Sequence, residues 1–336
     1  MRRVLLTGAS GFVGAHVLRH ILVNTDWDVV CPTTFTHKGL QDRIRLSAIG
    51  IDDDFARIKV IRCDFTSPIS PLTAREFGHI DYVLNLASES HVDRSIECPA
   101  PFIINNVSLI CHLLDWARAS DIEKFVQIST DEVYGPAPID YAHTEWKDQH
   151  LPSNPYSASK AAQEDIAFSY WRTYGVPIAI TNTMNIIGEM QDPEKFVPMV
   201  IKRVLNGDLM SIHGSLDGRV GSRFYLHARN QADGLLHVLK QDFPKYGEAD
   251  TPLRLHIAGE REVDNLELAQ MIADFVGKNL NYEIVDFHTS RPGHDLRYAL
   301  NCDKIESTGW KAPLALEESL KNTVEWTLQN REWLDL

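Results

Sequence analysis

A phenol and an ammonium lie close together in one short stretch of the chain. Tyr156 and Lys160 are four residues apart, which places both side chains on one face of a helix if that helix has begun by Ser157. A phenol with its ordinary pKa of about 10 is a poor base at neutral pH, and a neighbouring ammonium favours the phenolate. Taken alone, such a pair is usually two surface neighbours, so its meaning depends on what the chain places beside it.

Two adjacent carboxylates follow a short apolar run. Asp131 and Glu132 come directly after Thr130, at the carboxyl end of a strand expected over residues 125–128. In an open parallel sheet, ligands bind at this end of the strands. The pair is either a solvated turn or an acid and a base whose surroundings separate their pKa values. The position favours acid–base chemistry.

A glycine-rich turn near the N-terminus predicts a dinucleotide site. An expected strand over residues 4–6 runs into Gly8, Gly11 and Gly14, which precede an apolar helix. Glycines at these positions let the turn close, let backbone N–H groups approach a pyrophosphate and let the helix pack on the sheet. The flanking strand and helix make the motif stronger than its spacing alone, although a turn without a ligand is the alternative. With a nicotinamide bound, the phenol and the ammonium become a hydride-transfer pair.

The acidic residue that usually binds the adenosine ribose, about 20 residues beyond the glycines, is absent. The second expected strand is followed by Thr33 and Thr34, whose hydroxyls could bind a ribose diol. The nearby His37 and Lys38 could instead attract a 2′-phosphate. Asp64, after the third strand, either meets an adenine amino group or simply forms a turn. These residues alone leave NAD and NADP open.

Short apolar runs alternate with segments of helical periodicity through the first half of the chain. Such runs suit strands that are buried on both faces of a parallel sheet. The expected strands cover residues 4–6, 29–31, 58–61, 82–86, 125–128 and 178–180, and the expected helices cover 13–22, 102–117 and 158–174. The alternation predicts an α/β fold, a Rossmann-like doubly wound parallel sheet with right-handed crossovers.

From Asn185 onward the pattern loosens into turns, short strands and helices, the helices being expected over residues 196–205, 265–276 and 314–328. We expect a smaller mixed α/β substrate-binding lobe here. An amphipathic segment over residues 231–239 is expected to return to the first lobe. The predicted division is a dinucleotide-binding domain of residues 1–184 with 226–241, and a nucleotide-sugar-binding lobe of residues 185–225 and 242–336.

The composition is that of a globular protein, with 336 residues of which 44% are hydrophobic and 24% are charged. The net charge of −13 argues against a nucleic-acid partner, because such binding depends on Lys and Arg neutralising phosphates. Five scattered cysteines without Cys-x-x-Cys spacing indicate neither a disulfide framework nor a zinc site. The sequence has no apolar run that suits a membrane span or a signal peptide. We expect a cytoplasmic protein that binds no metal and no membrane.

With these segments assembled, the sequence resembles the dTDP-glucose 4,6-dehydratases of the extended short-chain dehydrogenase/reductase superfamily over almost its whole length. The motifs that carry the resemblance lie at residues 7–14, 86–95, 130–132, 156–160, 193–195 and 291–298. The Thr-Asp-Glu triplet at 130–132 is the discriminating one, since related epimerases and decarboxylases usually lack the acidic pair. The Arg-Pro-Gly-His-Asp run at 291–295 points to the same group.

The resemblance implies a role for each catalytic residue. Tyr156 would remove the proton from the sugar's O4 while NAD takes hydride from C4, with Lys160 and Thr130 in support. Glu132 would then take the C5 proton, Asp131 would protonate the departing C6 hydroxyl, and the hydride would return to C6. The expected product is a 4-keto-6-deoxy sugar. The cofactor is expected to be NAD rather than NADP, because the family uses NAD.

Binding residues are also implied by the resemblance. Those expected to bind the cofactor are Gly8, Ser10, Gly11, Phe12, Val13, Gly14, Thr33, Asp64, Phe65, Leu86, Ala87, Ser88, Tyr156 and Lys160. Those expected to bind the substrate are Ser90, Asn185, Glu194, Lys195, Arg223, Asn265, Arg291 and His294, each of which could equally be an ordinary surface residue. Arg223 is attractive because a guanidinium fork matches phosphate oxygens. Residues 185–189 and 221–225 depart from the family's pattern, so the substrate lobe has drifted more than the catalytic core.

Several alternatives stay open at this point. The substrate could be a UDP-, CDP- or GDP-hexose, or the enzyme could be a 4-epimerase, although Asp131 and Glu132 argue against epimerisation because that reaction needs no C5 proton abstraction. A catalytically silent nucleotide-sugar-binding regulator is a third reading, and it would need none of the acid–base residues. The resemblance suggests a homodimer, with the helices at 102–117 and 158–174 as its interface.

Overall fold

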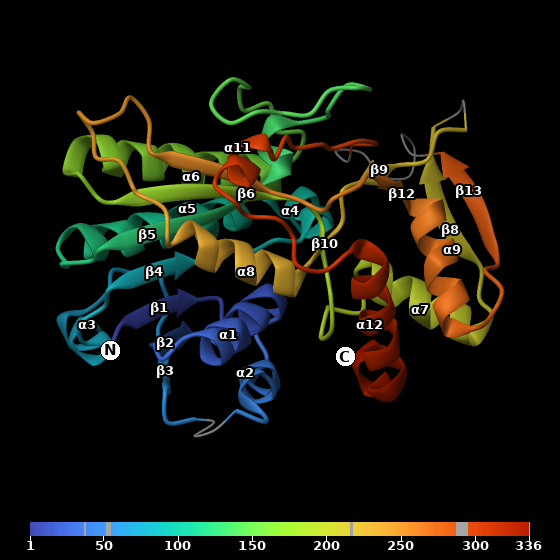
Figure 1. Ribbon diagram of the computed structural model, residues 1–336, viewed down its shortest axis with the longest axis horizontal. Coiled ribbons are helices and arrows are strands. Elements are labelled where there is room, and N and C mark those ends of the chain that lie inside the picture. The colour runs from blue at the N-terminus through green and yellow to red at the C-terminus, as the bar shows by residue number, and fades with distance from the viewer. Residues whose placement is uncertain (37, 52–54, 216–217, 287–294, 336) are drawn as a thin grey trace.

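The computed structural model describes residues 1–336 except 37, 52–54, 216–217, 287–294 and 336. In this part of the chain a large sheet carries helices on both faces, and a smaller lobe stands at one side of it (Figure 1). The carboxyl ends of the sheet's strands point toward the smaller lobe. The loops that follow the strands therefore lie where the two lobes meet.

The large sheet has seven strands in the order β11-β6-β5-β4-β1-β2-β3, and all of its pairings are parallel. The strands are β1 (Arg3–Thr7), β2 (Asp28–Thr33), β3 (Ile58–Arg62), β4 (Tyr82–Asn85), β5 (Lys124–Thr130), β6 (Ile178–Thr183) and β11 (Leu253–Ile257). The first six coincide with the apolar runs expected as strands. The chain builds outward from β1 through β2 to β3 and then returns to β4 on the other side of β1, so the prediction of a doubly wound sheet is confirmed. The switch point, where ligands bind in such folds, lies between β1 and β4.

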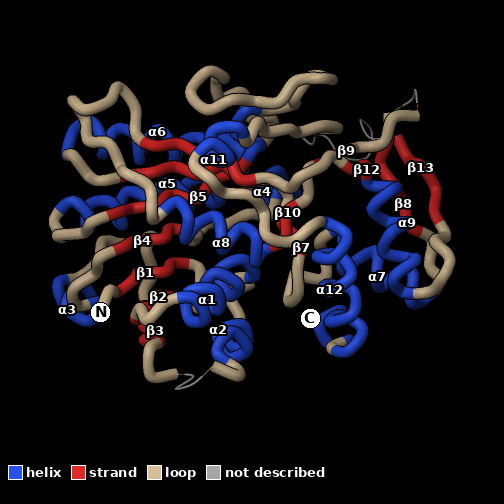
Figure 2. Tube along the Cα trace, in the orientation of Figure 1, coloured by secondary structure: helices blue, strands red, loops and turns tan. Residues whose placement is uncertain are grey.

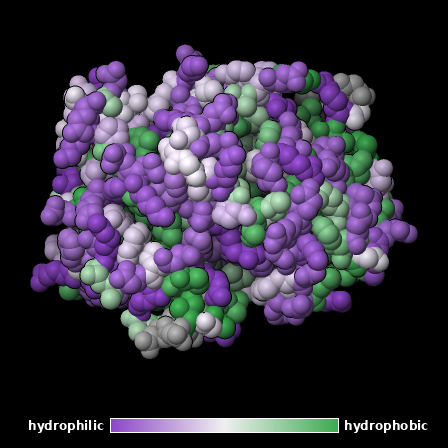
Figure 3. All heavy atoms as spheres, viewed as in Figure 1, coloured by the Kyte–Doolittle hydropathy of each residue, from purple (hydrophilic) through white to green (hydrophobic). Residues whose placement is uncertain are grey.

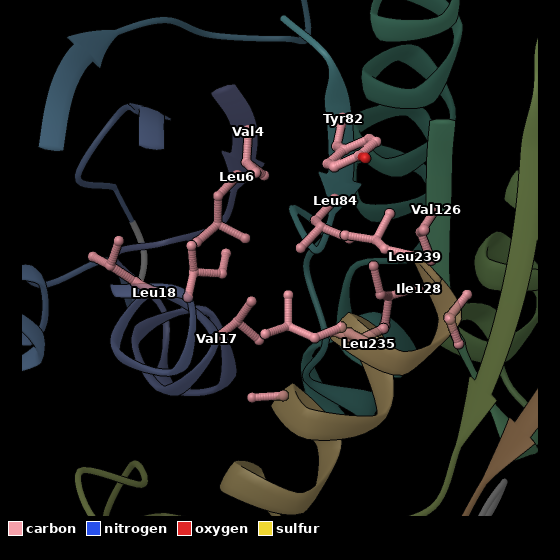
Figure 4. Close-up of a cluster of buried hydrophobic side chains, with 14 of the residues drawn as sticks. Val4, Leu6, Val17, Leu18, Tyr82, Leu84, Val126, Ile128, Leu235 and Leu239 are labelled. Carbon is pink, nitrogen blue, oxygen red and sulfur yellow. The ribbon is translucent and has the colours of Figure 1, made fainter. Parts of the chain in front are cut away.

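Alternate residues of each strand feed two separate cores. Val4 and Leu6 of β1 belong to the core on one face, and Leu5 belongs to the core on the other. Helices α1 (Phe12–Asn24), α2 (Gln41–Ala48) and α8 (Ala228–Val238) cover the first face, where Figure 4 shows Val17 and Leu235 meeting the strands. Helices α3 (Pro71–Phe77), α5 (Pro99–Arg118) and α6 (Pro155–Tyr174) cover the second face.

The smaller lobe has its own core between helices and short strands. Its helices are α7 (Phe196–Asn206), α9 (Asn265–Val276) and α12 (Leu316–Gln329), which coincide with the expected helices (Figure 2). Its parallel strand pair is β8 (Met210–Gly214) with β13 (Tyr282–Asp286), and its antiparallel pair is β9 (Ser222–Arg223) with β12 (Val263–Asp264). A further pair, β7 (Ile186–Ile187) with β10 (Leu226–His227), lies between the lobes. The described residues also include short helices, among them α4 (Val92–Glu97) and α11 (Asp303–Ser307).

The chain passes between the two lobes more often than the sequence indicates. Residues 242–336 were expected in the substrate lobe, but β11 pairs with β6 at the edge of the large sheet, so this part of the assignment needs correction. Arg254 and His256 interrupt the apolar run of this strand, so the hydrophobic pattern of the sequence did not predict it. Both side chains can be buried because they have polar partners. Helix α8 packs in one core with α1, where residues 226–241 were expected to return. The division into two domains otherwise stays a prediction.

The surface seen in Figure 3 is mostly hydrophilic. No helix among the described residues is both long and apolar enough to cross a membrane. The same residues contain no cluster of three or more His, Cys, Asp or Glu side chains that could hold a metal ion. All five cysteines are free thiols.

Candidate active site

The glycine-rich turn joins β1 to α1. Gly8 has a φ of 73°, and a Cβ at Gly14 would lie 2.0 Å from the Gly8 carbonyl oxygen, so the helix can start this close to the turn only without a side chain there. Gly11 is the N-cap of α1, no described side chain caps it, and Phe12 and Val13 are the first helical residues. The backbone N–H groups of this first helical turn are therefore available to an anion. The turn fits the pyrophosphate of a dinucleotide.

The ends of β2 and β4 lie against this turn. Ser10 Oγ is 2.8 Å from Thr33 Oγ1, which brings two hydroxyls to the position of the missing acidic residue. A Cβ at Gly8 would lie 3.1 Å from the backbone nitrogen of Ala87 and from the carbonyl carbon of Leu86, so the β4 loop, which continues into Ser88, approaches the turn closely. These contacts place three strand ends around one site.

Asp64 and Phe65 follow β3 at the far side of this region. The Asp64 carboxylate accepts hydrogen bonds from the backbone N–H (2.9 Å) and the hydroxyl (2.7 Å) of Thr66, as a turn-forming aspartate does. Phe65 is 4% exposed and belongs to the second core. Without a bound cofactor, the contacts of the Asp64 carboxylate are those of a turn-forming residue, which was one of its two interpretations.

Lys160 lies in the first half of α6 and is buried against the end of β5. Its Nζ donates hydrogen bonds to the Ile128 carbonyl oxygen and to Gln163 Oε1, each at 2.8 Å. Burial lowers the pKa of Lys160 to about 8, against an opposing effect of the Glu164 carboxylate. The ammonium is thus held in place by β5 and by the next turn of its own helix.

Tyr156 lies one helical turn before Lys160. Burial raises the pKa of its phenol, the carboxylates of Glu132 and Asp131 raise it further, and a hydrogen bond with Thr130 lowers it. Among the described residues no hydrogen bond joins Lys160 to the phenol. The expected stabilisation of the phenolate by Lys160 is therefore not provided by direct contact, and the phenol stays protonated in the protein alone.

Asp131 and Glu132 open the short helix η1 (Asp131–Tyr134) at the end of β5. Thr130 Oγ1 donates to Asp131 Oδ1 at 2.9 Å, whereas the buried Asp131 Oδ2 has no hydrogen-bond partner among the described residues. Burial and then repulsion by Glu132 raise the pKa of Asp131 to about 7. Asp131 can therefore hold a proton near neutral pH and present it from an oxygen to which no described residue is hydrogen-bonded.

Glu132 is oriented from α6. Asn154 Nδ2 donates to Glu132 Oε2 at 3.2 Å, and Asn154 is also the N-cap of α6. Burial raises the pKa of Glu132, while the Asn154 hydrogen bond and the positive charges of Arg223 and Lys195 lower it. Both carboxyls of the pair thus have raised pKa values, and the second lobe brings two cations to Glu132.

Arg223 makes different contacts from those expected of a free phosphate ligand. Its guanidinium donates to the backbone carbonyls of Ser222 (2.7 Å), Asp295 (2.6 Å) and Leu296 (2.6 Å), and it lies 4.5 Å from the centre of the Tyr298 ring. Arg223 therefore holds the segment around residue 296 near Asp131 and Glu132. Its positive charge still acts on Glu132.

The other expected substrate residues are spread around the junction of the lobes. Ser90 is exposed after β4, and Asn185 is exposed between β6 and β7. Glu194 pairs with Lys38 Nζ (3.2 Å) and His91 Nε2 (3.4 Å), and Lys195 is the N-cap of α7. The first residue of α9, Asn265, accepts a hydrogen bond from Tyr225 at 2.6 Å. Arg291, His294 and His37 lie outside the described residues.

Sequence reasoning missed several residues that hold this site. Asn154 followed by Pro155 is a helix-start signature that could have been found, since Asn favours the N-cap and Pro the first helical position. Behind Lys160, the side chain of Gln163 hydrogen-bonds the side chain of Gln127 and the backbone carbonyl of Asn106, and no local sequence motif predicts this buried polar group.

Comparison with known proteins shows which family the whole chain resembles. The model of the NAD dependent epimerase/dehydratase family matches residues 4–248. "dTDP-glucose 4,6-dehydratase 1" of Escherichia coli K12 is 36% identical, over 99% of this chain and 94% of that protein. Haloferax volcanii "Low-salt glycan biosynthesis protein Agl12" is 35% identical, over 98% of this chain and 99% of that protein.

Solved structures with the same fold include dehydratases and 4-epimerases. The dTDP-glucose 4,6-dehydratase DesIV of Streptomyces venezuelae, solved with NAD and TYD bound, has a TM-score of 0.86 and 31% identity over 98% of each chain. The UDP-glucuronic acid 4-epimerase of Bacillus cereus has a TM-score of 0.84 but 23% identity, over 98% of this chain and 99% of that one. The likeness to the epimerase extends to the fold alone.

Proposed function

Because this chain belongs to the NAD dependent epimerase/dehydratase family, we propose that it is a nucleotide-sugar 4,6-dehydratase that converts dTDP-glucose, or a related nucleoside-diphosphate hexose, to the 4-keto-6-deoxy sugar. The observation that carries this proposal is the pair Asp131 and Glu132 placed beside Tyr156. Removal of water across C5 and C6 needs a base for the C5 proton and an acid for the C6 hydroxyl, whereas 4-epimerisation acts at C4 and O4 and needs neither of these two groups. The relative at 36% identity is a dehydratase, and the epimerase fold neighbour is only 23% identical.

NAD is the proposed cofactor, supported by the glycine turn and by its presence in the DesIV structure. When bound, the nicotinamide would supply the hydride acceptor for C4 of the sugar and the hydride donor for C6. The N–H groups around Gly11 would hold the pyrophosphate, and the hydroxyls of Ser10 and Thr33 would hold the adenosine ribose. Because the hydride is returned, the redox state of the cofactor is the same before and after one turnover.

Each catalytic side chain then has a distinct proton task. Tyr156 takes the proton of O4, and it needs positive charge from the oxidised cofactor because the protein alone keeps its phenol protonated. Glu132, oriented by Asn154, takes the C5 proton, which becomes acidic beside the C4 ketone. Asp131, whose pKa is about 7, gives its proton to the departing C6 hydroxyl. Thr130 hydrogen-bonds Asp131 and stands beside Tyr156.

The smaller lobe is proposed to bind the nucleoside diphosphate. Lys195 and Arg223 bring positive charge to the edge of the site near Glu132, which suits a diphosphate. The remaining proposed contacts are Ser90, Asn185, Glu194, Asn265, Arg291 and His294. Arg223 acts in this proposal as a fixed charge that also holds the Asp295–Leu296 backbone, rather than as a mobile phosphate clamp.

The test separates the acid from the base. Wild-type protein with dTDP-glucose should yield the 4-keto-6-deoxy sugar without consuming added nicotinamide. Glu132→Gln should still oxidise C4, accumulate reduced cofactor and fail to exchange the C5 proton with solvent deuterium. Asp131→Asn should oxidise C4 and exchange C5 but eliminate slowly, and each variant should lose about a hundredfold to ten-thousandfold in turnover.

Glu325→Gln serves as the matched control, because Glu325 is exposed and pairs only loosely with Lys321 at 3.8 Å. It should keep wild-type turnover. Inversion at C4 with the C6 hydroxyl retained would make the protein an epimerase and overturn the proposal. Rapid C5 exchange in Glu132→Gln, or none in Asp131→Asn despite reduced cofactor, would reverse the two roles.

We also propose a cytoplasmic homodimer that pairs through α5 and α6. On α5, Ile104 is 63% exposed, and at the end of α6 Tyr174 is 52% exposed, so each of these helices exposes a large apolar side chain. Five free thiols suit a reducing compartment. Light scattering after size-exclusion chromatography should give twice the chain mass, and Ile104→Glu should give the monomer mass.

A further inference from the structure

A chain of buried polar side chains runs from the glycine-rich turn to the catalytic lysine. Thr7 Oγ1 donates to Asn85 Oδ1 (2.7 Å), and Asn85 Nδ2 donates to Gln127 Oε1 (2.7 Å). Gln127 Nε2 then donates to Gln163 Oε1 (3.2 Å), and Lys160 Nζ donates to the same oxygen (2.8 Å). The first four side chains are 0% exposed and Lys160 is 5% exposed. The chain crosses β1, β4 and β5 beneath the strand ends that form the active site.

The hydrogen bonds fix the orientation of the Gln163 amide. Its nitrogen donates to the Asn106 carbonyl oxygen at 2.8 Å, so its oxygen faces Gln127 and Lys160. Reversing the amide would place two N–H groups against the Lys160 ammonium and an oxygen against another oxygen. A buried polar group without a partner is costly, so this orientation is strongly preferred. Gln163 therefore presents an acceptor, and only an acceptor, to the lysine.

Two of the three ammonium protons of Lys160 are used within the protein. They go to Gln163 Oε1 and to the Ile128 carbonyl oxygen, which leaves the third proton for the reaction site. A buried ammonium loses its water and keeps its charge only where acceptors replace that water. Of the two acceptors, the Ile128 carbonyl belongs to the backbone, so Gln163 is the side chain that mutation can remove.

We propose, on the basis of the dehydratase function above, that Gln163 is a positioning residue that keeps Lys160 charged and aligned for catalysis. The other end of the amide chain supports this role. Thr7 Oγ1 also accepts a hydrogen bond from the Ala87 backbone at 2.9 Å, where the β4 loop meets Gly8. One hydrogen-bonded chain thus joins the segment that receives the cofactor to the lysine that assists the chemistry.

The charged groups around Lys160 make its protonation sensitive to this support. Burial lowers its pKa to about 8, and the Glu164 carboxylate on the same helix raises it. Glu164 itself is paired with Arg254 on β11 and with His150. The other titratable groups at this end of β5 and α6 are Tyr156, Asp131 and Glu132. Loss of the Gln163 acceptor should therefore lower the pKa of Lys160 further, because the charged form loses a hydrogen bond.

The test removes the acceptor while keeping the volume. Gln163→Met should reduce kcat by about tenfold to a hundredfold, the worth of one hydrogen bond to a charged group, with KM nearly unchanged. The alkaline limb is measured on the C4 oxidation step, which does not need the Asp131 proton, and it should move to lower pH by about one unit or more. Gln163→Glu restores an acceptor and adds a negative charge, so its alkaline limb should move to higher pH.

Gln231→Met is the matched control, because Gln231 is 0% exposed and accepts a hydrogen bond from Thr183 but does not contact Lys160. It should leave the position of the alkaline limb unchanged. If Gln163→Met lowers stability as Gln231→Met does but leaves the pH profile and kcat unmoved, Gln163 has a structural role only and the proposal is overturned. Gln163→Glu gives the opposite shift and keeps the test available if Gln163→Met does not fold.

A second readout is independent of turnover. Nitrogen NMR of isotopically labelled lysine, with the Lys160 signal assigned by its loss in Lys160→Met, reports the titration of the ammonium directly. The Lys160 titration should move to lower pH in Gln163→Met and to higher pH in Gln163→Glu. Should the protein fail to turn over any nucleotide hexose, the dehydratase function fails while this titration still decides the role of Gln163. Unchanged titration in both variants refutes it.

Discussion

Arg254 of β11 and Glu164 of α6 form a buried ion pair, and removing one partner should destabilise the protein strongly. Their side chains are 2% and 0% exposed. Glu164 also accepts hydrogen bonds from Asn182 Nδ2 (2.6 Å) and His150 Nε2 (3.0 Å), and Arg254 lies 3.8 Å from the centre of the Trp146 ring. Arg254→Met keeps much of the side-chain volume but leaves the Glu164 carboxylate buried without its main counter-charge.

Two routes give the same magnitude for this loss. Burial alone would raise the pKa of Glu164, but Arg254 and His150 outweigh it and lower that pKa from 4.5 to about 2. At about 1.4 kcal/mol for each pKa unit, this shift corresponds to roughly 3 kcal/mol of stability at neutral pH. Breaking a buried ion pair by removing one partner costs about 3–5 kcal/mol in other proteins. Because His150 remains, we expect the lower end, about 3 kcal/mol.

The pH dependence follows from the sign of the shift. The folded protein binds the Glu164 proton more weakly than the unfolded chain does, so the contribution is present above about pH 4.5 and is lost as the pH falls toward 2. Urea unfolding of wild type and Arg254→Met should therefore differ by about 3 kcal/mol at pH 7. The difference should shrink as the buffer is made more acidic.

Arg261→Met is the control for this measurement. Arg261 pairs with Glu267 (2.9 Å) and Glu317 (2.7 Å) at the surface, where its own side chain is 36% exposed. Exposed pairs are worth about 0–1 kcal/mol, so this variant should change little. Arg254→Met combined with Glu164→Met should recover much of the loss, because no buried charge is left. The reasoning is refuted if the two arginine variants cost the same, or if the double variant is no more stable than Arg254→Met.

Further predictions follow from other contacts. Because the pKa of Asp131 is about 7 and its proton is needed for elimination, kcat should fall as the pH rises above 7, and a profile flat to pH 9 would contradict this. Burial alone would lower the pKa of His150, but Asp165 and Glu164 raise it to about 9. Protonated His150 should therefore stabilise the folded protein fully below about pH 6.5, and this contribution should be lost as the pH rises through 9. Urea denaturation across this range should show the loss in wild type but not in His150→Asn. Gly14→Ala would place a Cβ 2.0 Å from the Gly8 carbonyl oxygen, so calorimetry should find NAD binding weakened at least tenfold. Unchanged affinity would show that NAD binding does not require glycine at this position. Thr33→Asp would set a carboxylate against a 2′-phosphate, and the ratio of NAD to NADP affinity should rise about tenfold or more; an unchanged ratio would remove Thr33 from the ribose site.

The side chains proposed to be catalytic could be placed near one another from the sequence because each depends on local features. Tyr156 and Lys160 are one turn apart on a helix, and Asp131 and Glu132 follow directly from an apolar strand. Strand ends of a parallel sheet meet at one edge, so segments far apart in the chain can be placed together without knowing their contacts. The glycine turn is similar, since its spacing and its flanking elements are read within a few residues.

What could not be predicted depends on partners that are distant along the chain. Gln163 presents its oxygen to Lys160 only because the backbone carbonyl of Asn106, 57 residues earlier, accepts a hydrogen bond from its amide nitrogen. Arg223 looked like a phosphate ligand, but backbone carbonyls more than 70 residues away occupy its guanidinium. Strand β11 was not predicted because Arg254 and His256 break its apolar run. These polar side chains can be buried there only because buried partners hydrogen-bond them. Such compensation is invisible to periodicity.

The route of the chain between β10 and α12 limits how this protein can acquire a new specificity. Helix α8 and strand β11 belong to the large sheet and its cover, yet they lie between stretches of sequence that build the smaller lobe. In a protein whose specificity lobe is one uninterrupted segment, a single recombination event can replace that lobe. Here the same exchange would also remove the edge strand of the sheet and the helix packed on α1. Changes of substrate in this lineage are therefore expected to accumulate by individual substitutions within the smaller lobe, not by exchange of the whole lobe.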